Sequence, residues 1–389
     1  LISGSGSKLL FSDNGGEYLS GDGTDLTITS GRHIVLALGS AGSVYHTGDG
    51  GSQNTIYGYQ AGAALASNVD NNVLIGYQAG TALNGGDQNV IVGHLAGDAL
   101  QGGEDNTFIG QAAGGATTAG DEMVIIGRNA GAGVITDAAV GTVLVGHSAG
   151  AALTTGAGNT AIGYQAGAAI TTGALNTAVG YQALSQNQNV GNFNTAVGYR
   201  CLYSVNPAAD DEGFNTAMGT AAGFELTTGE KNTYIGNDCG YYNETGDNNV
   251  YVGHNAGVGA NNNNHSNNTA VGTNAMFAVT TGADNTVVGS TAGDALTSGG
   301  SNVLIGMNAG GNFDGEDHNV AIGRSAFSGA VAGANYCVAI GGTAMQGAAT
   351  QNGTVAVGYT ALNALTSGAA NIAIGYRAAS ATTNSAGNV

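Results

Sequence analysis

Charged residues, proline and tryptophan are scarce in this chain of 389 residues. Only 8% of the residues are charged, one proline is present, and tryptophan is absent. A soluble domain normally has about 25% charged residues, so the length does not indicate a set of ordinary globular domains. Disorder is also disfavoured, because 42% of the residues are hydrophobic. Glycine is abundant, with 71 residues, and the accompanying Asn and β-branched residues favour stacked strands over helices.

Basic residues are few as well. Seven Lys and Arg stand against 26 Asp and Glu, which gives a formal net charge of −19. Such a chain repels phosphate backbones and anionic lipid, so nucleic acid is not an expected partner. No apolar run is long enough to cross a bilayer, so no membrane insertion is expected. The first residues show neither an initiator Met nor a signal-peptide pattern, and we expect a processed or partial chain.

A repeat of about 17 residues fills most of the chain. We align it on one glycine per copy, the anchor glycine, and number other positions from it, so that position −1 directly precedes the anchor. Twelve of the eighteen spacings are 17 residues, and the others are 18, 19 or 21. The nineteen anchors are Gly58, Gly76, Gly93, Gly110, Gly127, Gly146, Gly163, Gly180, Gly198, Gly219, Gly236, Gly253, Gly272, Gly289, Gly306, Gly323, Gly341, Gly358 and Gly375.

The three residues before each anchor form a short apolar strand. Position −3 is Thr, Val or Ile in every copy, and position −1 is Ile or Val except at Tyr57 and Met218. Residues two apart on a strand share a face, so we predict that these two positions form a wall inside the coil. Position −2 is then predicted to face away from it, toward a second copy of the chain, because a strand apolar on both faces is covered on both. Contacts with that copy are expected at Ile91, Phe108, Ile125, Leu144, Tyr234, Tyr251 and Leu304.

Two further positions predict the shape of the coil. Position −4 is Asn in fifteen copies, and Asn suits both a bend and an amide ladder between stacked coils. Position +3 is Ala in seventeen copies and Cys at Cys201 and Cys239, which indicates a tight interior corner. The predicted fold is therefore all-β: a parallel β-solenoid of about nineteen coils over residues 48–389, with one 17–18-residue repeat and two short strands per coil. Residues 1–47 are expected to form a β-rich cap or shaft segment. Because Val389 falls inside a twentieth repeat, we expect the product to continue beyond it.

The repeat Asn-Thr-Ala-Val-Gly-Tyr-Gln-Ala, as at residues 176–183, resembles the head repeats of YadA-like trimeric autotransporter adhesins. It is closer to the 17-residue variant of bacteriophage tail fibres. The segments at residues 8–13 and 21–28 also resemble shaft sequence of phage fibre proteins. The resemblance implies a left-handed β-roll, a homotrimer around one axis, and a role in surface attachment. The apolar residues at position −2 are then expected to line that axis.

The function implied is that of a structural tail-fibre protein of a virion, serving as a shaft and in host attachment. Its implied partners are other tail or fibre proteins and a glycan or protein of the host-cell surface. The alternative is the head of a bacterial trimeric adhesin at the cell surface. An ice-binding solenoid is a third hypothesis, since Thr is common, but the Thr residues at position −3 are predicted to lie inside the coil.

Catalytic and metal motifs have simpler explanations within the repeat. Residues 146–150, Gly-His-Ser-Ala-Gly, match a nucleophile elbow, but residues 163–167 are in the same register, and an elbow needs a strand–turn–helix context. Ser148 is therefore an ordinary repeat position, and we expect neither an enzyme nor a cofactor. The cysteines, Cys337 included, are interpreted as buried thiols. Acidic turns offer a possible calcium site, although solvated turns are favoured; they contain Asp87, Asp105, Asp247, Asp284 and Asp317.

Aromatic residues recur at position +1, directly after the anchor. They either form a ladder that stiffens the outer wall or contact a receptor through exposed ring faces. The sequence does not separate these hypotheses. The tyrosines at this position are Tyr59, Tyr77, Tyr164, Tyr181, Tyr199, Tyr359 and Tyr376, and histidines take it at His94, His147 and His254.

Overall fold

The computed structural model describes residues 53–66, 68–186, 191–206, 213–261, 263–329, 333–347, 352–384 and 386–387. The chain divides into two units, Leu1–Val44 and Tyr45–Val389. The cap or shaft segment predicted at residues 1–47 lies outside the described residues. The account below concerns the second unit.

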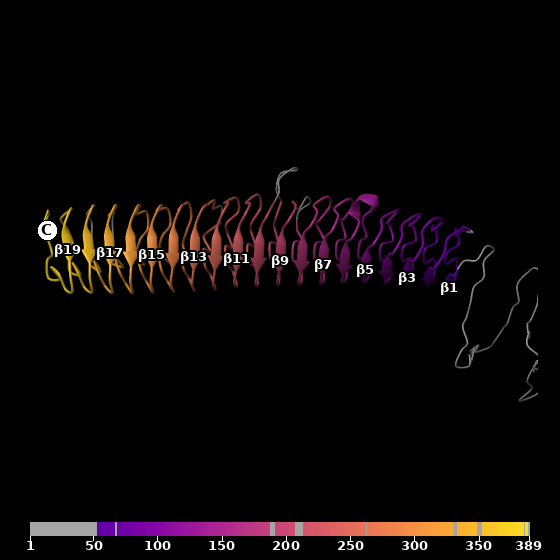
Figure 1. The fold of residues 1–389 in the computed structure, drawn as a ribbon, viewed down its shortest axis with the longest axis horizontal. Coiled ribbons are helices and arrows are strands. Elements are labelled where there is room, and N and C mark those ends of the chain that lie inside the picture. Colours follow the sequence, from indigo (N-terminus) through magenta and orange to yellow (C-terminus); the bar gives the residue numbers. More distant parts are fainter. Residues whose placement is uncertain are drawn as a thin grey trace, which may run out of the picture. The chain divides into compact units, whose positions relative to one another are not determined.

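The second unit is a stack of nineteen parallel strands, one per repeat, each paired with the next along the chain (Figure 1). The predicted β-solenoid is confirmed, with nineteen strands marking eighteen turns. The strands are β1 (Thr55–Tyr57), β2 (Val73–Ile75), β3 (Val90–Val92), β4 (Thr107–Ile109), β5 (Val124–Ile126), β6 (Val143–Val145), β7 (Thr160–Ile162), β8 (Thr177–Val179), β9 (Thr195–Val197), β10 (Thr216–Met218), β11 (Thr233–Ile235), β12 (Val250–Val252), β13 (Thr269–Val271), β14 (Thr286–Val288), β15 (Val303–Ile305), β16 (Val320–Ile322), β17 (Val338–Ile340), β18 (Val355–Val357) and β19 (Ile372–Ile374).

Each coil has one strand, where two were predicted. The return path consists of turns, and the only helix among the described residues is the 3-10 helix η1 (Asp137–Ala139). The turns still bond from coil to coil through the backbone: the Gly62 N–H donates to the Ala79 carbonyl at 2.9 Å, and the Gln78 N–H to the Tyr59 carbonyl at 2.8 Å. Hydrogen bonds between stacked coils therefore replace a second sheet.

The anchor glycines mark a close approach between coils. Their φ angles lie between 129° and 143°, a region that residues with a Cβ rarely adopt. A Cβ added to Gly163 would lie 2.4 Å from the carbonyl oxygen of Gly180 in the next coil. Only glycine meets both conditions, which accounts for one glycine per turn of the stack.

The prediction of which strand face lies inside is wrong. From β2 to β19 the middle residue, position −2, is buried, and the residues at positions −3 and −1 are half-buried or exposed. Ala178, for example, is fully buried between the half-buried Thr177 and Val179. The physical reason lies at position −4: the Asn there must be buried to bond between coils, and residues two apart share a face. The residue at position −2 therefore lies in the core together with the residue at position −4.

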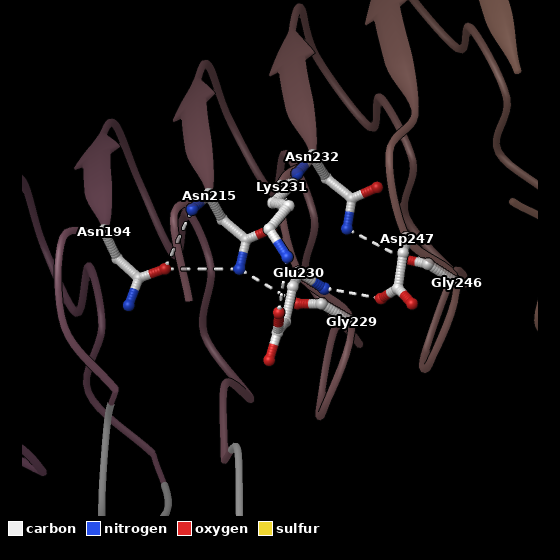
Figure 2. Close-up of polar contacts among 8 residues, drawn as sticks. All are labelled: Asn194, Asn215, Gly229, Glu230, Lys231, Asn232, Gly246 and Asp247. Carbon is white, nitrogen blue, oxygen red and sulfur yellow. Dashed lines mark hydrogen bonds and ion pairs between the residues drawn. The ribbon is translucent and has the colours of Figure 1, made fainter. Parts of the chain in front are cut away.

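The predicted asparagine ladder is present inside the bend (Figure 2). The Asn215 backbone N–H donates to Asn194 Oδ1 at 3.1 Å, and the Asn232 N–H donates to Asn215 Oδ1 at 3.0 Å. Most of the amide nitrogens reach a carbonyl of the following turn, as Asn215 Nδ2 does at Gly229 with 2.9 Å. The buried side chain thus satisfies backbone groups that the bend takes out of the sheet.

The core space of each coil is shared between positions −2 and +4. All ten copies with a large residue at −2 have glycine at +4, as in Leu144 with Gly150. A Cβ on Gly150 would lie 2.5 Å from the Leu144 side chain. Where −2 is Ala, a large residue at +4 fills the space in six copies, for example Leu202 with Ala196. The two positions form one volume-conserving pair.

Two neighbouring coils have tyrosine in the core, at Tyr234 and Tyr251. Both side chains are fully buried, and their rings stack with centroids 5.5 Å apart. The hydroxyls have partners among the turn residues of the return path: Asn243 Nδ2 donates to Tyr234 Oη at 2.7 Å, and His265 Nδ1 lies 2.7 Å from Tyr251 Oη. Buried tyrosine hydroxyls need such partners, and the sequence reasoning did not identify this polar cluster.

Candidate interaction surface

Position −3 forms an uninterrupted row of β-branched side chains on the outside of the sheet, and position −1 adds Ile and Val except at Tyr57 and Met218. We call positions −3 and −1 of the nineteen strands the outward face. Position −1 contributes Ile, Val and Met side chains that remain partly in solvent, with 38% of Ile235 and 50% of Met218 exposed. Monomeric proteins rarely expose apolar patches larger than a few hundred Å², and this face extends along all eighteen turns. The outward face is therefore the strongest candidate for an interface.

The residues predicted to contact another copy of the chain lie elsewhere. Each of these position −2 side chains is at most 1% exposed within the single chain, so none is available at a surface. That assignment was wrong because it depended on the inverted strand face. The residues concerned are Ile91, Phe108, Ile125, Leu144, Tyr234, Tyr251 and Leu304.

The same inversion removes the argument against ice binding. Threonine occupies position −3 in β7 to β11, and these five side chains lie on the outward face rather than in the core. Elsewhere this position is mostly Val, and position −1 has no Thr. The face is thus more apolar than hydroxylated.

The residues at position +1 form stacked aromatic ladders beside the outward face. Ring centroids are 5.0 Å apart between Tyr164 and Tyr181 and 5.5 Å apart between Tyr181 and Tyr199, with interplanar angles of 12° and 16°. His147 extends this ladder at 5.2 Å from Tyr164. Two shorter ladders contain Tyr59, Tyr77 and His94, and Tyr359 with Tyr376.

Stacking limits what these tyrosines can bind. Each ring inside a ladder has its faces against the neighbouring rings, and the exposed part consists of ring edges and hydroxyls. A sugar ring that packs flat on an aromatic face would find one only at the end of a ladder. The geometry therefore favours a stiffening or interface role over flat stacking on a receptor glycan.

A second aromatic ladder, which the sequence reasoning missed, lies at position +5. Tyr203, Phe224 and Tyr241 stack at 5.0 and 4.9 Å. Arg200 lies 5.3 Å from the ring centroids of both Tyr199 and Tyr203, so its guanidinium joins the two ladders. The recurrence of aromatic residues five positions after three successive anchors was the available sequence signal.

Ser148 and the cysteines occupy ordinary repeat positions. Ser148 has φ 55°, close to the 52° of Gln165, the corresponding residue of the next coil.

All three cysteines are buried and none forms a disulfide bond. Burial raises the pKa of the Cys201 and Cys239 thiols to about 12, so the reactive thiolate is scarce.

The acidic turns contain structural hydrogen bonds. Asp247 Oδ1 accepts the Glu230 N–H at 2.8 Å (Figure 2), and Asp87 and Asp317 accept backbone N–H groups of the preceding coil at 2.7 Å each. Asp105 and Asp284 occupy the neighbouring position −5, where φ is positive. Within the described part of the chain, no three His, Cys, Asp or Glu side chains are arranged to hold a metal ion.

The comparisons do not assign this fold and surface to a known protein. No model of a known protein family, no curated protein and no solved structure matches the chain. Among the residues that the structure describes, no helix is long and apolar enough to span a membrane.

Proposed function

We propose that the chain is the rod-like part of a trimeric fibre, a tail-fibre protein of a virion that serves as a rigid shaft and in host-surface attachment. The observation that supports the proposal most is the outward face. Parallel strands stacked at about 4.8 Å per turn make a rod of roughly 90 Å, and a β-branched row along its whole length needs a covering surface. A second and third copy, placed in parallel, supply the same row at the same repeat.

The host-side role rests on the repeat resemblance, and the partners proposed are other fibre proteins and a surface glycan or protein. The head of a bacterial adhesin at the cell surface has the same rod and is the alternative. A genome segment that contains the full-length gene distinguishes them, because an adhesin gene encodes an export signal and a membrane anchor, whereas a phage gene lies among virion genes.

The assembly is tested by native mass spectrometry and electron microscopy of the 389-residue chain. We expect a particle with three times the chain mass and the outline of a straight rod. Val179→Asp with Val197→Asp places charges on the outward face and should yield folded monomers. Thr155→Asp, on the exposed opposite bend, is the matched control and should remain trimeric. A wild-type monomer, or a trimer unaffected by the two aspartates, would contradict the proposal.

Ice binding is the second candidate, favoured by the five outward Thr residues of β7 to β11. Thermal hysteresis of the purified protein decides between them. A trimer buries these residues and should show none, whereas an ice-binding monomer should lose its hysteresis on Thr195→Leu substitution.

A further inference from the structure

Two rows of exposed side chains border the outward face. Along each coil, positions −5, −3, −1 and +1 alternate outward with the buried positions −4 and −2. We call position −5 the leading margin and position +1 the trailing margin. The two positions are six residues apart along the chain with the strand between them, so they lie at most about 20 Å apart. The two margins of one coil therefore lie on opposite sides of the strand.

In five coils the two margins are complementary in size. A glycine on one margin accompanies a large ring on the other, as in Gly158 with Tyr164 and Gly353 with Tyr359. The relation also holds with the sides exchanged, because Tyr336 on the leading margin accompanies Gly342 on the trailing margin. Further small–large coils contain Gly141 with His147 and Ala370 with Tyr376.

In two further coils the margins match in charge or in apolar character. Glu122 on the leading margin accompanies Arg128 on the trailing margin, and both are exposed. The ion pair Lys231–Glu230 is the only one between described residues, so Glu122 and Arg128 do not pair with each other within one chain. The Arg128 guanidinium instead contacts the His147 ring of the next coil. Phe193, an exposed apolar residue on the leading margin, accompanies Tyr199. Several coils lack this complementarity, among them those with Leu175 and Tyr181, Gln88 and His94, and His318 and Arg324.

We infer that the leading margin of one chain packs against the trailing margin of its neighbour, at the same coil level, along three seams of a parallel homotrimer. This inference rests on the trimer proposed above. When three identical outward faces surround a three-fold axis, each corner brings the leading edge of one face to the trailing edge of the next. Closed symmetry allows no axial shift between chains, so Gly353 meets Tyr359 and Glu122 meets Arg128. The tyrosine ladders then line the seams.

Cysteine cross-linking tests the register of the seam. In a background with Cys201→Ala, Cys239→Ala and Cys337→Asn, the matched pair is Gly353→Cys with Tyr359→Cys. A Cβ at Gly353 meets no atom within 4 Å inside the chain. Disulfides need Cα atoms roughly 4.4–6.8 Å apart, so the pair should link only between chains and give a covalent trimer on oxidation. The mismatched control, Gly353→Cys with Arg324→Cys, is displaced by two coils, about 10 Å, and should not link.

Native mass spectrometry of the same samples separates the two proposals. A trimer in which the matched pair stays unlinked, or links no better than the mismatched pair, overturns the seam and leaves the trimer standing. A folded monomer overturns the trimer itself.

A charge exchange provides an independent test. Glu122→Arg should weaken the trimer at low salt, with about a 3–10-fold rise in the concentration needed for assembly, as expected for one exposed ion pair per seam. Arg128→Glu added to it should restore assembly. A double variant as weak as the single variant would contradict the pairing.

Discussion

The coils anchored on Gly198 and Gly253 fill the same core space in opposite ways. The first places Ala196 on the strand and Leu202 in the turn, and the second places Tyr251 on the strand and Gly257 in the turn. The Tyr251 coil also needs buried polar partners for the tyrosine hydroxyl, which contacts both Asn249 Oδ1 at 3.1 Å and His265. The comparison shows that the repeat conserves core volume across the coil and not residue type at one position.

The largest effect is expected where the turn glycine meets a ring that cannot move. A Cβ on Gly257 would lie 2.4 Å from the Tyr251 ring, which its hydrogen bonds hold in place, and Gly257 has φ 58°. Gly257→Leu should therefore destabilise the fold by about 4 kcal/mol or more, from overpacking and left-handed strain together. Denaturant unfolding followed by circular dichroism measures it.

Gly310→Leu is the matched control for that substitution, since its neighbour is the more flexible Leu304. Its cost should be smaller, and adding Leu304→Ala should recover most of it, because the coil then has the arrangement of the Gly198 coil. Equal losses in the single and double variants would refute the shared-volume rule.

The opposite change should create a cavity. Leu202→Ala in the Gly198 coil leaves alanine at both core positions and should cost about 2–5 kcal/mol, as for other large-to-small core substitutions. Adding Ala196→Leu should restore part of the loss. The same unfolding measurement applies, and a double variant less stable than Leu202→Ala would show that the strand and turn positions do not exchange volume.

The Tyr251 coil should also be sensitive to acid in a way that the Ala196 coil is not. Burial lowers the pKa of His265 to about 3 from its ordinary 6.5. Between pH 6.5 and 3 the unfolded chain therefore binds a proton at His265 that the folded chain does not bind. The contribution of His265 to the free energy of unfolding is fully present above pH 6.5 and falls as the pH drops toward 3, by at most about 1.4 kcal/mol per pH unit. In the protonated ring the buried Nε2 would also carry a proton, and Nε2 has no hydrogen-bond partner among the described residues.

Unfolding at pH 7 and pH 5 measures this slope, since most carboxylates of ordinary pKa stay ionised there. His265→Asn should be less stable at pH 7 but should have a flatter pH profile. A slope unchanged by the substitution would assign the acid sensitivity to other groups.

The smallest effects are expected at the corner that both coils share, position +3. Cys201→Ala and Cys239→Ala restore the common residue, and each should change stability by less than about 1 kcal/mol. The Cys239→Ala variant should lose slightly more stability than Cys201→Ala, because the Cys239 Sγ donates to the Tyr251 carbonyl at 3.1 Å. In the folded wild type both thiols should resist a thiol reagent until denaturant is added. Rapid labelling at neutral pH would contradict the burial.

The sequence predicted the solenoid well because its evidence is repeated nineteen times. The anchor spacing, the Asn at position −4 and the small residue at position +3 each have a local physical reason, and the structure confirms the coil count, the amide ladder and the interior corner. The exposed surface was harder to predict. Assigning positions −3 and −1 to the core placed Ile91 and Phe108 on an interface and Thr195 inside the coil, and all three assignments were wrong.

By itself the sequence determined the period, the strand in each period and the glycine that allows coils to stack, since these depend on residues close together in the chain. Only the tertiary structure decided which strand face is inside. Alternation shows that residues two apart share a face, but all three strand positions are apolar, so hydrophobicity could not choose between the faces. Closure of the coil decides between the faces: it buries the Asn at position −4, and position −2 lies on the same face of the strand. Closure also brings position +4 and, in one coil, His265 into the same core, as contacts between residues too distant in sequence for a local pattern to reveal.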